Sequence, residues 1–193
     1  LYMGTFHSVF SRILRAEAQR IGYNSNFTIY DETDSRSLLK SIIKTLGLSD
    51  KDYKPSTVHS IISMAKNQLV GADAFAVSNG GQSGLKGAKL KAVSQIYAVY
   101  QARCRQANAM DFDDLLVNTF RLFNENADIR NKYAERFQYI LVDEYQDTNF
   151  VQVAIVKLLT AKHQRICVVG DDYQSIYSFR GASIDNILDY QKK

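Results

Sequence analysis

Two carboxylates follow an apolar run in the second half of the chain. Asp143 and Glu144 come directly after Phe137-Gln-Tyr-Ile-Leu-Val142. Such a run predicts a strand buried on both faces of a parallel sheet, and open α/β sheets bind ligands at the carboxyl ends of their strands. There, one carboxylate can hold Mg²⁺ and a second can take a proton from an attacking water. The alternative is a strand that ends in two solvated acids, and the pair alone does not decide.

A second apolar run, Arg165-Ile-Cys-Val-Val169, leads into Gly170-Asp171. A helix is predicted between the two runs, over about residues 150–161. Strand, helix and strand in this order predict a right-handed parallel crossover.

The chain before these strands is mainly helical. Apolar spacing predicts helices over residues 8–21, ending at Gly22, and over 112–123, with a short strand at 27–30. From residue 34 to 108 the pattern is almost wholly helical. Within it, Asn79-Gly-Gly-Gln-Ser-Gly84 predicts a mobile loop. A phosphate cradle is the alternative, but neither a Lys-Ser/Thr pair nor an apolar strand accompanies it.

The composition describes an ordinary globular chain of 193 residues, 46% hydrophobic and 23% charged. A net charge of +4 suits a polyanionic partner without requiring one. Neither a signal peptide nor an apolar run of about 18 residues is present, so we expect a cytoplasmic protein with no membrane partner. Cys104 and Cys167 are expected to be reduced thiols in or near the core.

Two longer strings extend the acid pair. Val142-Asp-Glu-Tyr-Gln-Asp-Thr-Asn149 is followed by Val169-Gly-Asp-Asp-Tyr-Gln-Ser-Ile-Tyr-Ser-Phe-Arg-Gly-Ala182. Together they resemble superfamily 1 DNA helicases of the UvrD/PcrA/Rep type, which carry a DEYQDTN Walker B motif and a VGDxxQSIYxWRGA motif. Thr5-Phe-His-Ser8 and Asp111-Phe-Asp-Asp-Leu115 resemble two further family segments. The resemblance therefore covers essentially the whole chain.

The resemblance implies an α/β fold: part of a RecA-like P-loop NTPase parallel sheet with a large, mainly helical inserted subdomain. Residues 1–33 and 108–193 would belong to motor domain 1A, and residues 34–107 to helical subdomain 1B. The chain starts at Leu1 and has no G-x-x-x-x-G-K-[ST] loop. We expect that loop upstream, a second motor domain downstream, and no ATP hydrolysis by the isolated chain.

The resemblance also implies roles in ATP hydrolysis. Asp143 would help bind Mg²⁺, Glu144 would act as the base toward water, and Gln174 would sense the γ-phosphate of ATP. A neutral amide suits the last role because it can hydrogen-bond either a phosphate oxygen or the water. The alternative for Gln174 is a turn residue.

Three residues near the C-terminus, Tyr177, Phe179 and Arg180, suit single-stranded DNA. Bases stack on aromatic rings at about 1–3 kcal/mol each, and Arg adds a charge for phosphate. The family usually has Trp at the position of Phe179, and the smaller ring of Phe predicts weaker stacking on the base. The alternative is that the aromatic pair packs in the core.

The segment Thr5, Phe6 and His7 would line a base pocket in the family. The alternative is a helix start, with Thr5 or Ser8 as its cap and Phe6 as a hydrophobic staple. Both interpretations are compatible.

Other charged residues are weaker candidates. Asp113 and Asp114 precede an apolar helix and are explained by capping, with no catalytic role. The basic residues of the helical block form either a duplex-facing surface or a solvated face. They are Lys40, Lys44, Lys66, Lys86, Lys89, Lys91, Arg103 and Arg105.

The implied parent is an ATP-dependent helicase that moves 3′ to 5′ on single-stranded DNA and opens single-strand/duplex junctions in repair or replication restart. One alternative is a non-catalytic DNA-binding module, against which Glu144 argues because binding needs no general base. The other is the motor part of a helicase-nuclease subunit.

Overall fold

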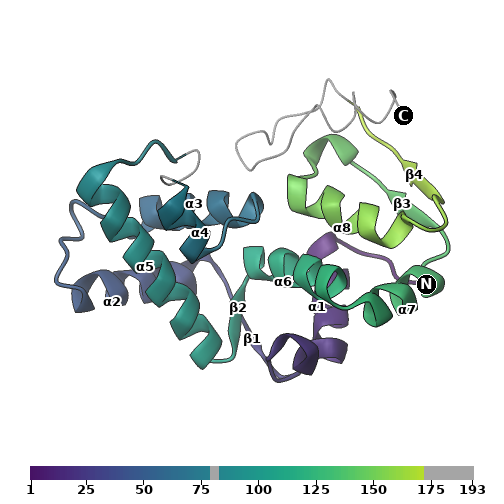
Figure 1. Ribbon diagram of the computed structural model, residues 1–193, viewed down its shortest axis with the longest axis horizontal. Helices are drawn as coiled ribbons and strands as arrows, with labels where there is room; N and C mark the ends of the chain where they lie inside the picture. Colours follow the sequence, from purple (N-terminus) through teal and green to yellow (C-terminus); the bar gives the residue numbers. More distant parts are fainter. Residues whose placement is uncertain (79–82, 172–193) are drawn as a thin grey trace. The chain divides into compact units, whose positions relative to one another are not determined.

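The computed structural model describes residues 1–78 and 83–171. The chain divides into two compact units, Leu1–Leu115 and Leu116–Lys193. In Figure 1 the elements, in chain order, are α1 (Phe6–Glu17), η1 (Ala18–Ile21), β1 (Thr28–Tyr30), α2 (Glu32–Thr45), α3 (Pro55–Asn67), α4 (Ala72–Val77), α5 (Gly87–Gln106), β2 (Ala109–Asp111), α6 (Phe112–Glu125), α7 (Ala127–Arg136), β3 (Ile140–Val142), η3 (Tyr145–Asp147), α8 (Phe150–Thr160) and β4 (Ile166–Val168).

The first helix begins two residues earlier than predicted. Thr5 caps α1, because its hydroxyl oxygen accepts a hydrogen bond from the backbone nitrogen of Ser8 at 3.2 Å. The helix tightens into the 3₁₀ turn η1 and stops at Gly22, as predicted. Gly22 has a φ of 75°, and a Cβ there would lie 2.5 Å from the guanidinium of Arg105. The positive φ is what favours glycine here, because the guanidinium is the end of a flexible side chain and can shift.

A parallel pair of short strands frames the helical block of the first unit. Thr28 lies opposite Ala109 and Tyr30 opposite Asp111. Helix α2 follows β1 and α5 precedes β2, so the chain enters and leaves the helical block through neighbouring strands (Figure 1). The proposed boundaries of subdomain 1B, residues 34 and 107, fall inside this first unit, and the assignment stays a prediction.

Helices α2 to α5 enclose their own core. Helix α5 packs against α2 and α4, and α2 packs against α3. Burying each large apolar side chain contributes about 1.5–3 kcal/mol, so this core is the main support of the block. Its buried members are Leu39, Ile42, Ile43, Val58, Ile62, Ala65, Ala72, Phe75, Val93, Ile96, Tyr97, Tyr100 and Cys104.

The second unit contains the predicted strand, helix and strand. β3 and β4 pair in parallel, with Ile140 opposite Ile166 and Val142 opposite Val168, which confirms the predicted parallel pairing. Helix α8 connects the two strands in sequence and packs against α7. Val142 and the inner face of α8 are buried.

The prediction that these strands are buried on both faces is wrong. The side chain of Leu141 is 70% exposed, and its partner across the sheet, Cys167, is also exposed. Residues directly opposite in a parallel pair share a face, and within residues 1–78 and 83–171 nothing covers this one. The expectation for the thiols therefore holds for Cys104, which is buried, and fails for Cys167.

Two further expectations from the sequence concern the loop at residues 79–84 and the absence of a membrane-spanning segment. Residues 79–82 of the predicted loop lie outside the described residues. No helix in the described part of the chain is both long and apolar enough to cross a bilayer.

Candidate functional site

Asp143 and Glu144 lie where β3 ends. Both residues are exposed, and the strand that precedes them is the predicted one, although it covers only Ile140–Val142. Glu144 has a φ of 50° and a ψ of 44°, a left-handed conformation that residues with a Cβ rarely adopt. The Asp143 Oδ1 accepts a hydrogen bond from the backbone nitrogen of Glu144 at 2.9 Å. The strand end thus presents two accessible carboxylates on an uncommon backbone conformation.

Backbone hydrogen bonds extend the contact between the two chain segments beyond the strands themselves. The nitrogen of Val169 donates to the oxygen of Val142 at 2.8 Å, and the nitrogen of Tyr145 donates to the oxygen of Val169 at 2.9 Å. The turn after β3 is therefore fixed to the segment after β4, which continues as Gly170-Asp171.

A buried amide joins the same two segments. Gln146 lies in η3 and is 0% exposed. Its Nε2 donates to Glu144 Oε2 at 2.5 Å, and its Oε1 accepts from the backbone nitrogen of Asp171 at 3.1 Å. Both ends of the amide are used, as expected of a buried polar side chain.

The carboxylate oxygens at this strand end suit a magnesium ion that also binds the phosphates of a nucleotide. Across residues 1–78 and 83–171, no three His, Cys, Asp or Glu side chains gather into a group that could hold a metal. Mg²⁺ commonly binds through one or two carboxylates together with waters and substrate phosphates. Asp143, an exposed carboxylate at the carboxyl end of a parallel strand, fits such a site.

Thr5 and Phe6 form the start of α1. The cap formed by Thr5 confirms the helix-start interpretation. Phe6 is the first residue of the helix, and its ring lies 5.6 Å from that of Phe10, one turn later. A hydrophobic staple starts before the cap, so that part of the interpretation is wrong. Phe6 is half-buried.

His7 is half-buried beside an aromatic ring. Its imidazole meets the ring of Phe112 edge-on, with the centroids 5.7 Å apart. Burial lowers the pKa of His7, and this outweighs two effects that raise it: the charge of Asp113 and a hydrogen bond that the imidazole donates to the backbone of Phe112. The imidazole is therefore neutral at neutral pH.

The four candidates near the C-terminus, Gln174, Tyr177, Phe179 and Arg180, lie outside the described residues. Their roles stay predictions.

Comparison with known proteins places the chain. Residues 1–193, the whole chain, match the family model described as the UvrD/REP helicase N-terminal domain. The chain belongs to the UvrD/Rep helicase family. It is 43% identical over 192 residues to the ATP-dependent DNA helicase PcrA of Bacillus subtilis (strain 168). It is also 43% identical to the PcrA of Staphylococcus aureus (strain Mu50 / ATCC 700699) and 42% identical to that of Staphylococcus epidermidis, over 193 residues in each case.

These matches cover the whole of this UvrD/Rep-family chain but only part of each relative. The aligned region is 25% of the Bacillus subtilis protein and 26% of the two staphylococcal proteins. The chain therefore spans about a quarter of the length of the relatives that it matches.

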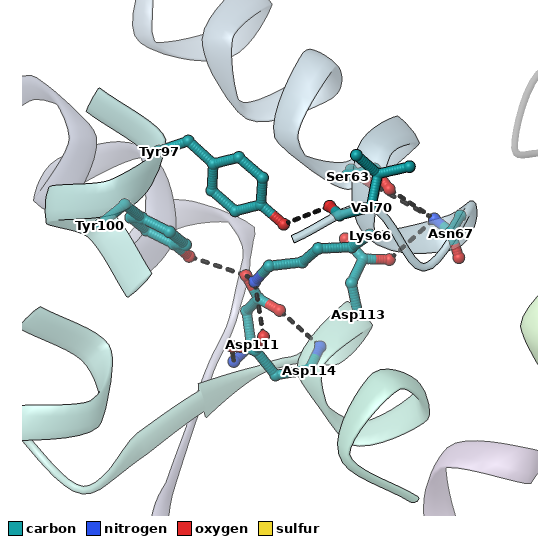
Figure 2. A network of polar contacts seen from close by, with 9 residues as sticks. All are labelled: Ser63, Lys66, Asn67, Val70, Tyr97, Tyr100, Asp111, Asp113 and Asp114. Atoms are coloured by element: carbon teal, nitrogen blue, oxygen red, sulfur yellow. Dashed lines mark hydrogen bonds and ion pairs between the residues drawn. The ribbon is translucent and has the colours of Figure 1, made fainter. Parts of the chain in front are cut away.

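In this UvrD/Rep-family chain, the acids of the segment 111–115 lie in a buried network (Figure 2). The Nζ of Lys66 lies 2.7 Å from Asp111 Oδ2 and 2.7 Å from Asp114 Oδ1. Asp111 Oδ1 accepts from the Asp114 nitrogen at 2.8 Å, and Asp114 Oδ2 accepts from the Asp111 nitrogen at 3.2 Å. This reciprocal pair caps α6, so capping is confirmed for Asp114. The hydroxyl of Tyr100 donates to Asp111 Oδ2 at 2.9 Å.

The charges in this network shift one another's pKa values. Burial alone would lower the pKa of Lys66, but Asp111 and Asp114 outweigh it and raise that pKa well above its usual value. Burial also raises the pKa of Asp111, yet Lys66 outweighs this and holds it below the usual value. For Asp114, burial and then Asp111 raise the pKa to about 6, against the opposing effect of Lys66.

The inclusion of Lys66 in a duplex-facing surface is therefore wrong. Its side chain is 3% exposed, and its charge is paired with two carboxylates. Other basic residues of the block, including Lys40, Lys44, Lys86 and Lys89, are exposed, and their contact with DNA stays a prediction.

Reasoning from the sequence misplaced Lys66 and gave Gln146 no role. Lys66 carried a signal, because it lies four residues after Ile62 and eight after Val58 on the apolar stripe of α3. Gln146 lies in the motif that follows β3, but its contact with Asp171 left no local pattern, because Asp171 lies 25 residues further along the chain.

Proposed function

We propose that this chain is part of the first motor domain of an ATP-dependent DNA helicase. Residues 1–33 and 108–193 would form part of a RecA-like P-loop domain, with residues 34–107 as its helical insertion. The observation that carries the proposal is the exposed pair Asp143 and Glu144 at the carboxyl end of β3, next to the parallel strand β4, in a member of the UvrD/Rep family.

The proposed chemistry is hydrolysis of ATP. Asp143 would hold Mg²⁺ together with the phosphates, and the ion, when bound, neutralises charge on the phosphoryl oxygens. Glu144 takes a proton from water while the water oxygen bonds to the γ-phosphorus and the bond to the β–γ bridging oxygen breaks, giving ADP and phosphate. Gln174 would respond to the γ-phosphate.

The proposed track is single-stranded DNA, with single-strand/duplex junctions as the place of unwinding. Tyr177 and Phe179 would stack on bases and Arg180 would contact phosphate. Thr5, Phe6 and His7 would line a base pocket. The low pKa of His7 supports stacking, since a neutral imidazole adds no charge for phosphate. Movement from 3′ to 5′ and a role in repair or replication restart are part of the proposal and rest on the resemblance alone.

The test is made on the full-length parent protein. Glu144→Gln keeps the size of the side chain and removes the base, so we expect DNA-stimulated kcat for ATP to fall about 1,000-fold, with binding of ATP and DNA retained. Glu135→Gln, an exposed acid in α7, is the matched control and should behave as the wild type. Intact DNA-dependent hydrolysis in Glu144→Gln would show that Glu144 is not the base.

The isolated 193-residue chain should not hydrolyse ATP, because its sequence has no G-K-[ST] phosphate loop. DNA-stimulated ATPase activity of the purified chain, above that of its Glu144→Gln variant, would contradict this.

A further inference from the structure

We infer that Gln146 is a positioning residue: it holds the carboxylate of Glu144 in register with the segment after β4. The inference rests on the proposed function, because it assumes that Glu144 is the base. The observation behind it is the pair of hydrogen bonds from one buried amide to Glu144 and to the backbone of Asp171.

Glu144 needs such a partner because nothing else described at the site orients its carboxylate. The residue is exposed, and the hydrogen bond to Asp143 fixes its backbone nitrogen and leaves its side chain free to rotate. A glutamate at the surface samples several rotamers, whereas a base must face one water. The 2.5 Å hydrogen bond from Gln146 selects one orientation.

Gln146 itself is held firmly. It is 0% exposed in the short η3 turn, where the nitrogen of Asp147 donates to the oxygen of Glu144 at 2.9 Å. The carbonyl end of its amide is engaged by the Asp171 nitrogen. Reversing the amide would place two acceptors together at Glu144 and two donors together at Asp171, so this arrangement is the one that satisfies both partners.

Asp171, the second partner of Gln146, connects Glu144 to a different segment of the chain. Asp171 directly precedes the segment that contains Gln174. A displacement of the Asp171 backbone would therefore be transmitted through one side chain to the carboxylate of Glu144. The backbone bond between Tyr145 and Val169 ties the same two segments but does not reach the carboxylate.

A purely structural role for Gln146 makes a different prediction. If the amide only satisfies the Asp171 nitrogen, replacing it lowers stability, and its effect on hydrolysis adds to that of a Glu144 substitution. If it acts through Glu144, its effect disappears once the base is gone.

The experiment uses the full-length parent and two substitutions. Gln146→Met keeps the volume and removes both hydrogen bonds. Gln146→Glu keeps an acceptor for Asp171, removes the donor to Glu144 and adds a like charge. For both we expect DNA-stimulated kcat to fall about 10- to 100-fold, while the KM for ATP and the affinity for single-stranded DNA change less than about 3-fold. Gln138→Met, at an exposed position before β3, is the matched control and should keep wild-type kcat.

A double-substitution cycle then decides the role. On the Glu144→Gln background, Gln146→Met should change residual hydrolysis by less than about 2-fold. A further loss of about 10-fold on that background, wild-type kcat in both Gln146 variants, or loss of cooperative unfolding in both would overturn the inference. Wild-type kcat in Glu144→Gln would instead reject the proposed function on which the inference rests.

Discussion

Asp111 and Asp143 occupy similar places in the sequence, because each stands at the carboxyl end of a short parallel strand and is followed by a further acid. Asp111 and Asp114 are buried around Lys66, and their remaining oxygens cap α6. Asp143 and Glu144 are exposed, and the contact that holds Glu144 is a neutral amide. Acids with an internal cation serve the fold, whereas acids that stay solvated on a fixed backbone are available to a ligand.

Removing the charge of Lys66 from its buried ion pairs with Asp111 and Asp114 should have the largest effect on stability. Lys66→Met leaves Asp111 and Asp114 without a counter-charge, so the free energy of unfolding should fall by about 3–5 kcal/mol. Urea unfolding followed by circular dichroism measures this. Lys44→Met, at an exposed position in α2, should change it by less than about 0.5 kcal/mol. Equal stability of the two variants would mean that the buried group does not support the fold.

Neutralising the exposed Asp143 should have the opposite effect: activity should fall and stability should stay unchanged. Asp143→Asn keeps an oxygen for the Glu144 nitrogen, so stability should stay within about 0.5 kcal/mol of the wild type. DNA-stimulated kcat of the full-length parent should fall about 100-fold, equivalent to about 2.7 kcal/mol. Magnesium titration of the ATPase should show a higher Mg²⁺ requirement. A stability loss with unchanged kcat would reverse the comparison.

The cost of Lys66→Met should depend on pH. Without the cation, burial raises the pKa of both Asp111 and Asp114, and that of Asp114 is already about 6 with Lys66 in place. An acid whose pKa is raised on folding contributes stability that is present at low pH and lost as pH rises through the raised pKa. The deficit against the wild type should therefore be about 1–2 kcal/mol larger at pH 8 than at pH 5. Adding Asp114→Asn should flatten this difference.

The smallest effect concerns the half-buried His7. In the full-length parent, His7→Ala should weaken single-stranded DNA binding about 5-fold through lost stacking. Because the imidazole is neutral, the dependence of affinity on salt should not change. Arg180→Ala should instead reduce the salt slope by about one. Fluorescence anisotropy across a salt series separates the two, and a reduced slope for His7→Ala would show that the residue carries charge.

Long periodic segments were predictable from the sequence, and short ones were not. The helical pattern of residues 34–108 predicted α2, in which Leu39, Ile42 and Ile43 are buried. Helix α4 has six residues, too few to show a period. Helix α7 is strongly polar, with Ile129, Tyr133 and Ala134 as its buried residues.

At the candidate site, too, features with a local sequence signal were predictable and features that depend on distant residues were not. The place of Asp143 after a strand was predictable because an apolar run is a local signal. The buried strand β2 depends on pairing with β1, and the position of Gln146 depends on Asp171. Contacts between residues far apart in sequence leave no local pattern, so these features emerged from the structure alone.

The parallel pairing of β1 and β2 has a consequence for how this chain can change over evolution. The chain departs for the helical block after Tyr30 and returns at Ala109, in the neighbouring strand. Because the two strands are parallel, the connection between them needs a crossover of about a dozen residues or more. The two ends of the block therefore lie close together, and its length can vary between these points in evolution, provided that Lys66 is kept as the counter-charge of Asp111 and Asp114.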